Sequence, residues 1–285
     1  MADGVVKLNQ RGWGQTSRTD AWWMQPSAVF VGLLAFLILA NLRVFEGDYY
    51  FSGHSSVAAN QTTNYLTPFY SPLMFEQPKY AERPSHHAWW SAKPGWLPSW
   101  VSPAALILIF PAGFRFTCYY YRGAYYKAFW ADPPNCAVGE PRKGYLGENS
   151  LPLILQNIHR YFFYFAVAFL VVLAYDAWNG FWFNVGTHDA PQWRFGVGVG
   201  SLVLTLNVYL LCGYTLGCHS LRHLIGGRKD CVSENPLQHK LYQCVSCLNS
   251  RHMLWAWCSL VWVAFTDIYV RFVAKGAWTD LHFVF

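Results

Sequence analysis

A stretch with several possible metal ligands ends one of the apolar segments of the chain. It reads LCGYTLGCHSLRHLIGG over residues 211–227 and contains Cys218, His219, Arg222 and His223. On a helix, His219 and His223 share one face because they are four residues apart. Cys218 and Arg222 share the adjoining face. Such groups are costly inside a membrane and are usually kept for a function. The stretch therefore predicts a metal centre for electron transfer near one membrane face.

Other cysteines and histidines lie near the ends of neighbouring apolar segments. They are Cys118, Cys136, His159 and His252. Histidines on facing helices suit haem b, whereas two thiolates with two imidazoles suit a Rieske-type [2Fe–2S] centre. Zinc accepts the same two-plus-two set of ligands. The C-x-H and C-x-x-H boxes of soluble Rieske proteins are absent, so spacing alone leaves these cofactors open.

Five apolar segments are long enough to cross a bilayer, which takes about 20 residues. They cover about residues 28–45, 101–130, 151–178, 195–225 and 249–276. Proline, glycine or polar clusters end them, such as ADPPN after the second and GGRKD after the fourth. We therefore expect an all-α polytopic membrane protein with a bundle of five transmembrane helices over residues 28–276.

The basic residues predict how this bundle is oriented. Lysine and arginine cluster in and beside the loops at residues 131–150 and 226–248, and such loops are usually cytoplasmic. This places the N-terminal segment, residues 1–27, in the cytoplasm. The long segment at residues 46–100 becomes an extracytoplasmic cap, and the tail at residues 277–285 also lies outside. All the candidate ligands then meet at the cytoplasmic end of the bundle.

The composition supports a membrane location. The chain of 285 residues is 54% hydrophobic and only 13% charged, against about 25% charged in an average soluble protein. The net charge of +6 is spread out without a polybasic tract, so no nucleic-acid partner is expected. The N-terminal residues lack the apolar core and cleavage site of a signal peptide. We expect a multi-pass protein of the cell inner (plasma) membrane, in contact with lipid.

Four motifs carry a resemblance to a known family. They are FRFTCYYYRGAYYKAFW with PPNCAV (114–138), LILQNIHRYFFY (153–164), GCHSLRHLIGG (217–227), and LNSRHMLWAW with FTDIYVR (248–271). Residues 100–276 thereby resemble the single membrane anchor of the haem-free, type F succinate dehydrogenases, a class of respiratory complex II.

The resemblance implies the function and partners of the chain. It implies a five-helix anchor that binds a flavoprotein subunit with FAD and an iron–sulfur subunit on the cytoplasmic side. The flavin active site would lie on the partner, so this chain would have no catalytic residue of its own. A membrane-embedded Rieske-type [2Fe–2S] cluster with two Cys and two His ligands would pass electrons from succinate to a quinone, expected to be menaquinone. The chain would then serve the respiratory chain and the tricarboxylic acid cycle.

One ligand from each of four helices is the simplest way to hold such a cluster. The set we predict is Cys118, His159, Cys218 and His252. Cys136 is the first reserve, because a loop cysteine after the second helix could fold back over the cluster. His219 and His223 are an alternative imidazole pair.

Several polar and aromatic residues are candidates for the quinone site. Histidines that are not ligands could donate hydrogen bonds or protons to the quinone head. The candidates are His219, His223, Arg222, Arg115, Tyr119, Trp255 and Asp267.

Two other functions compete with this hypothesis. A dihaem cytochrome b anchor of the same enzyme class could use His159, His252 and one of the two residues His219 and His223, but the first two helices have no histidine in their apolar cores. A transporter or non-redox scaffold would more often have acidic residues at mid-membrane or an inverted repeat, and neither pattern is visible.

Overall fold

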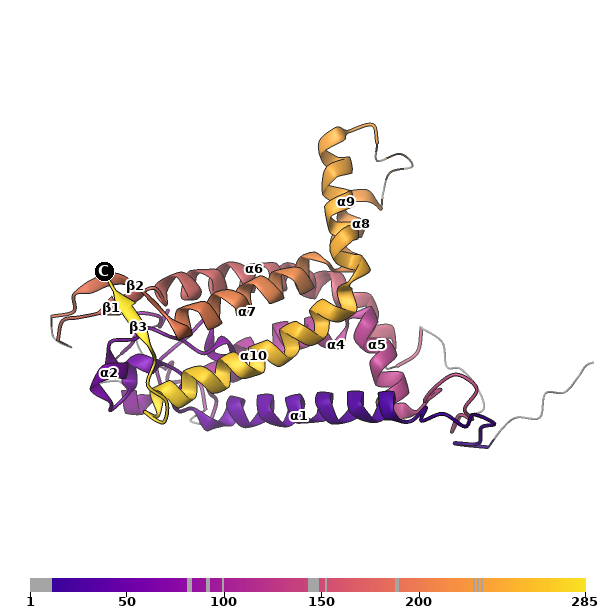
Figure 1. Cartoon of the computed structure of the whole chain (residues 1–285), viewed down its shortest axis with the longest axis horizontal. Helices are drawn as coiled ribbons and strands as arrows, with labels where there is room; N and C mark the ends of the chain where they lie inside the picture. Colours follow the sequence, from indigo (N-terminus) through magenta and orange to yellow (C-terminus); the bar gives the residue numbers. More distant parts are fainter. Residues whose placement is uncertain are drawn as a thin grey trace, which may run out of the picture. The chain divides into compact units, whose positions relative to one another are not determined.

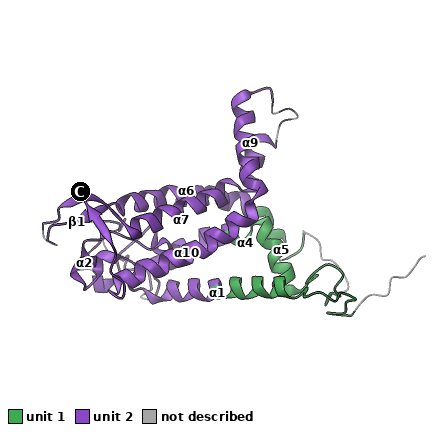
Figure 2. Cartoon of the chain, in the orientation of Figure 1, with its two compact units in different colours: residues 1–35, 115–158 green, residues 36–114, 159–285 purple. Residues whose placement is uncertain are grey.

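The computed structural model describes residues 12–80, 84–90, 93–98, 100–142, 149–151, 153–187, 190–227, 229, 231 and 233–285. The chain divides into two compact units, which Figure 2 shows in different colours. Unit 1 consists of Met1–Ala35 and Arg115–Ile158, and unit 2 consists of Phe36–Phe114 and His159–Phe285. The regular structure of both units is mostly helical (Figure 1).

Within the described residues, four helices are long and apolar enough to cross a membrane. They are Met24–Glu46, which is α1; Ile154–Asn179, which contains α6 (His159–Asn179); Val199–Leu216, which is α7; and His252–Ala274, which is α10. Long runs of Leu, Val, Ala and Phe without internal proline favour helix here, because each backbone group is then bonded within its own segment. These helices coincide with the first, third, fourth and fifth predicted segments.

The segment predicted as one helix over residues 101–130 is divided into shorter pieces. They are α3 (Pro103–Ile107), α4 (Ile109–Phe116), α5 (Tyr119–Tyr125) and the π-helix η4 (Tyr126–Trp130). Pro111 has no N–H to bond the carbonyl of Ile107, and Cys118 is extended, with φ −65° and ψ 131°. The prediction of one continuous helix over this range is therefore wrong.

The expectation of a purely helical fold also needs correction. The range predicted as a helix over 195–225 begins in strand β2 (Trp193–Gly198), continues as α7, and restarts as α8 (His219–Gly226) after the extended Cys218. Strand β2 pairs antiparallel with β1 (Trp182–Asn184) and with β3 (His282–Val284) in the predicted C-terminal tail. The predicted loop at 226–248 contains most of α9 (Pro236–Ser250). The pairing of β2 with β3 joins residues far apart in sequence, which hydropathy does not detect.

Unit 2 is organised around α7, which packs against both α6 and α10. Its core contains Leu204, Val270 and Val273 together with Tyr65 and Phe183. Gly213 of α7 lies where a Cβ atom would come within 2.4 Å of the Trp255 ring. A glycine is therefore required at this point for α7 and α10 to approach so closely.

A buried carboxylate joins the C-terminal strand to the start of α7. Asp280 accepts hydrogen bonds from the hydroxyls of Tyr65 (2.8 Å) and Tyr269 (2.7 Å) and from the N–H of Gly200 (2.9 Å). A carboxylate at a helix N-terminus is also stabilised by the helix dipole. Asp280 thus ties the chain end to the sheet and to α7.

In the described part of the predicted cap at residues 46–100, the helices are short: η1 (Ser52–His54), α2 (Ala58–Gln61), η2 (Pro68–Tyr70) and η3 (Pro78–Tyr80). Its aromatic core includes Tyr50, Phe69 and Tyr70. The buried His87 ring lies 2.9 Å from Asp176 of α6, through Nδ1 and Oδ1. The segment is therefore a packed body attached to α6.

Unit 1 joins the N-terminal segment to the chain after η4. Arg18 donates to the side chain of Asn135 (3.2 Å) and to the carbonyl of Cys136 (3.0 Å). The rings of Phe30 and Phe129 pack with centroids 4.9 Å apart. The described part of this unit also contains the short 3-10 helix η5 (Leu153–Ile158).

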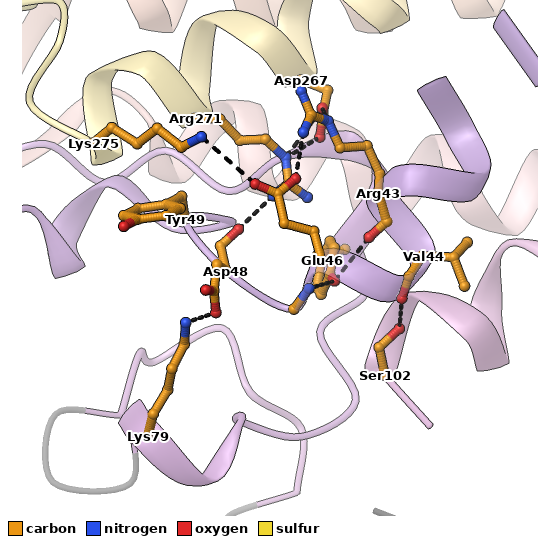
Figure 3. A network of polar contacts seen from close by, with 12 residues as sticks. Arg43, Val44, Glu46, Asp48, Tyr49, Lys79, Ser102, Asp267, Arg271 and Lys275 are labelled. Atoms are coloured by element: carbon orange, nitrogen blue, oxygen red, sulfur yellow. Dashed lines mark hydrogen bonds and ion pairs between the residues drawn. The ribbon is translucent and has the colours of Figure 1, made fainter. Parts of the chain in front are cut away.

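An ionic network occupies one end of α10 in unit 2 (Figure 3). The carboxylate of Asp267 accepts from Arg43 Nε at 2.8 Å and from Arg271 Nε at 3.0 Å. Glu46 pairs with both arginines, and Asp267 and Arg271 are almost fully buried. Charges at this depth are tolerated because they are paired with one another.

We predict that Asp267→Ala strongly destabilises the protein. Removing one partner of a buried ion pair leaves the other charge uncompensated and costs roughly 3–5 kcal/mol. The control Lys79→Gln breaks the more exposed pair with Asp48, and such pairs contribute about 0–1 kcal/mol. Thermal unfolding of the detergent-solubilised protein measures both variants. Equal unfolding midpoints for the two variants would contradict the role assigned to Asp267.

Candidate metal and quinone site

A buried thiol and a buried imidazole face each other in unit 2. The Nε2 atom of His159 lies 2.9 Å from the Sγ atom of Cys218, and the two residues are 4% and 1% exposed. His159 is the first residue of α6, and Cys218 is the extended residue between α7 and α8. The break after Leu216 is therefore what turns the Cys218 side chain toward α6.

Local hydrogen bonds orient both side chains. The N–H of Ser220 donates to Cys218 Sγ at 3.4 Å, and the backbone of Phe114 forms a hydrogen bond with the His159 ring. Hydrogen bonds of this kind orient ligands at metal sites and set the histidine tautomer. These hydrogen bonds therefore fix the orientation of both side chains.

Stacked aromatic rings connect His159 with His252 inside unit 2. Phe114 stacks on His159 with centroids 4.7 Å apart and planes at 10°. Tyr214 stacks on His252 at 5.0 Å and 17°, and Phe114 meets Tyr214 at 5.4 Å. Three of the four predicted ligands therefore belong to one neighbourhood at one end of α6, α7 and α10.

The other two predicted cysteines belong to unit 1. Cys118 is buried and immediately precedes α5, and its carbonyl accepts from the N–H of Arg122 at 2.9 Å. Cys136, the reserve ligand, is exposed. Among the residues that the structure describes, no three His, Cys, Asp or Glu side chains are arranged as ligands of one ion. The four-residue ligand set therefore stays a prediction.

The two other histidines of the first motif form a pair on α8. Their Nε2 atoms are 2.8 Å apart, so one ring donates to the other. Partial burial, together with the charges of His223 and Arg222, lowers the pKa of His219 below its usual value. Arg222 donates from Nε to the hydroxyl of Tyr242 at 3.1 Å. The two imidazoles of α8 can hold and transfer protons, and Arg222 on the adjoining face can donate hydrogen bonds.

The remaining quinone candidates are dispersed. Trp255 lies against Gly213, and its buried Nε1 has no hydrogen-bond partner among the described residues. Asp267 is 15 residues beyond His252 on α10, about 22 Å along the helix, and is held by two arginines. The structure therefore does not bring Asp267 to the histidines.

Arg115 and Tyr119 lie in unit 1 and contact their own neighbours. Arg115 donates from Nη1 to the hydroxyl of Tyr121 at 3.0 Å. The Arg122 guanidinium lies 5.1 Å from the centre of the Tyr119 ring. These contacts are compatible with a local structural role.

Sequence reasoning missed the two rings that flank the imidazoles. Phe114 and Tyr214 each precede a predicted cysteine ligand, Cys118 or Cys218, by four residues. A four-residue spacing places side chains on one helix face. This spacing from a predicted ligand is the sequence feature that could have pointed to the two rings. It does not reveal which histidine each ring contacts.

Comparisons with known proteins agree on the family. The family model for the actinobacterial succinate dehydrogenase subunit SdhC matches residues 24–276. One chain of a solved structure, the Mycobacterium smegmatis Sdh1 complex in the apo form, is 43% identical to this chain. The match covers 98% of both chains, with a TM-score of 0.81. No curated protein matches the chain. The chain therefore belongs to the actinobacterial SdhC family and is a membrane subunit of a succinate dehydrogenase.

Proposed function

We propose that this subunit carries electrons from a soluble iron–sulfur subunit to a quinone in the membrane. The observation that supports this most directly is the buried contact between His159 and Cys218 at the end of the bundle. A thiol and an imidazole are suitable ligands for a redox metal, and a membrane subunit of this enzyme needs a route for electrons. The flavin active site, with FAD, belongs to a partner subunit in this proposal.

The metal centre that we propose is a Rieske-type [2Fe–2S] cluster. Such a cluster takes two thiolates and two imidazoles, and when bound it exchanges one electron at a time. We assign Cys118, His159, Cys218 and His252 as ligands, with Cys136, His219 and His223 as reserves. His159 and Cys218 already meet, and Tyr214 holds the His252 ring by stacking.

Aromatic rings give this neighbourhood a low polarity. Phe114 and Tyr214 are almost fully buried, and each covers one imidazole face. Apolar surroundings limit solvent access and influence the reduction potential of a metal centre. The rings therefore both orient the imidazoles and exclude water from them.

We choose the residues of the quinone site by their ability to donate protons. Reduction of a quinone to a quinol takes up two electrons and two protons, so proton donors must lie near the quinone head. We assign this role to His219 and His223, with Arg222 as a hydrogen-bond donor to a quinone oxygen, and we expect menaquinone. Trp255 offers a buried N–H that could serve the same oxygen.

The proposal includes an orientation in the plasma membrane. The N-terminal segment and the α8–α9 end would be cytoplasmic, where the flavoprotein and iron–sulfur subunits would bind. The broken segment at 101–130 would cross the membrane in addition to the four long helices. The packed cap at 46–100 would lie outside. Basic residues near α8 and α9 support this orientation through the positive-inside rule.

The double variant His159→Ala/His252→Ala should lose quinone-linked turnover but retain reduction of artificial soluble acceptors by succinate. The physical reason is that both imidazole ligands are removed while the partner's flavin chemistry is untouched. Steady-state assays of the purified complex with both acceptors measure this. Cys231→Ser, at an exposed loop residue, is the control. Normal quinone reduction by the double variant would exclude this ligand assignment.

Single cysteine variants should separate ligands from packing residues. Cys118→Ser and Cys218→Ser should each lower the iron content by about the two atoms of one [2Fe–2S] cluster and remove its EPR signal from the reduced complex. Cys212→Ser, within α7, should leave both unchanged. A strong visible Soret band in the unaltered complex would instead favour the haem alternative. If the EPR signal is lost in Cys136→Ser but not in Cys118→Ser, Cys136 is the ligand in place of Cys118.

His219→Gln should impair quinone reduction without loss of the cluster. Glutamine keeps a hydrogen-bonding group of similar reach but cannot donate a proton at neutral pH, so the proton step should slow by about 10²-fold or more. The expected result is a lower kcat for quinone with an unchanged EPR signal. His239→Gln, on α9, is the matched control. If the EPR signal disappears as well, His219 is a ligand rather than a proton donor.

A further inference from the structure

Helices α8 and α9 form a hairpin that leaves the end of the helical bundle of unit 2. The two helices pack against each other, and they run crosswise to α7 and α10 (Figure 1). The hairpin starts directly after α7 at Cys218 and ends at Arg251, where α10 begins. Both ends thus lie where the helices of the bundle end. In a membrane crossed by α7 and α10, the hairpin would extend along the membrane surface.

The outer side of α9 carries an exposed apolar stripe. Leu237 is 68% exposed and Leu241 is 49% exposed, and Cys244 continues the same side at a spacing of three. Residues at such spacings lie on one helix face. The inner side of α9 is used for packing, because Val245 is buried. Leu224 of α8 is a further exposed leucine of the hairpin.

The charge of the hairpin is positive. Between Cys218 and Arg251 the acidic residues are Asp230 and Glu234, and the basic residues are Arg222, Arg228, Lys229, Lys240 and Arg251. Lys240 is exposed and lies beside the leucine stripe, about 60° around the helix from Leu237. The polar Gln243 lies beyond Lys240 on the side away from the leucines. The exposed surface of α9 thus passes from apolar through basic to polar.

This order is typical of a helix that lies in the interface between a membrane and water. Such helices are amphipathic and basic, with leucines in the acyl region and lysines at the headgroups. Each lysine near an anionic surface adds to the attraction.

We propose that the α8–α9 hairpin is an interfacial membrane anchor whose Leu237 and Leu241 insert into lipid while Lys240 binds anionic headgroups. The proposal requires only that the chain is a membrane subunit. It is independent of the redox centre proposed above.

Photo-crosslinking in the assembled complex tests the hairpin. The variants Leu237→p-benzoyl-phenylalanine and Leu241→p-benzoyl-phenylalanine are irradiated in native membranes, and the adducts are identified by mass spectrometry. Both should yield lipid adducts. The same substitution at Val261, an exposed residue within α10, is the positive control, and at Gln243 it is the matched control that should give no lipid adduct.

Two crosslinking results would overturn the proposal. Adducts with a protein subunit at residues 237 and 241 would show that the stripe is a protein interface and would overturn the proposal. Absence of adducts, with normal lipid adducts at Val261, would show a solvent-exposed hairpin and would overturn the proposal as well.

In nanodiscs of mixed anionic and zwitterionic lipids, the adduct at Leu241 should be enriched in anionic lipid. Lys240→Gln should abolish that enrichment, and an unchanged enrichment would refute the role of Lys240.

Discussion

The need to satisfy polar groups inside the protein shapes unit 2 at both ends of α10. In a bilayer no water is available to solvate a buried charge or imidazole, so each must find a partner within the chain. At one end Asp267 meets this need with two arginines. At the other end His252 is stacked on Tyr214, beside the contact between His159 and Cys218. One helix therefore connects a charged structural network with the candidate redox site.

The close approach of α7 and α10 makes the second of these arrangements possible. Gly213 allows the Trp255 ring to lie directly on α7, and the next residue, Tyr214, reaches His252. Four residues later the chain turns out of α7 at Cys218. The close packing of α7 on α10 and the positions of two predicted ligands, Cys218 and His252, are therefore determined by the same short stretch of α7. A bulkier residue at 213 would separate the helices and move both side chains.

In the two proposals above, α8 carries the residues assigned to proton transfer within a few residues of an exposed leucine of the anchor. The His219–His223 pair occupies one face, while Leu224 is exposed elsewhere on the helix. The hairpin that α8 begins is joined to the bundle at both of its ends, so its position relative to His159 and Cys218 is restricted. Under the proposed function, this restricted position would keep His219 and His223 close to the site where electrons leave the protein.

Hydropathy and residue types by themselves predicted the membrane class, five apolar segments of which four contain the long helices, and the histidines and cysteines worth testing. These features are local, because the length of an apolar run and the identity of a side chain do not depend on distant contacts. Only the tertiary structure decided that His159 contacts Cys218, that Asp267 is engaged by Arg43 and Arg271, and that residues 282–284 complete a sheet. Each of these joins parts of the chain that are distant in sequence or on different elements. The break at Cys118 and the turn at Cys218 also escaped prediction, because an extended residue within an apolar segment leaves hydropathy unchanged while it redirects the side chain.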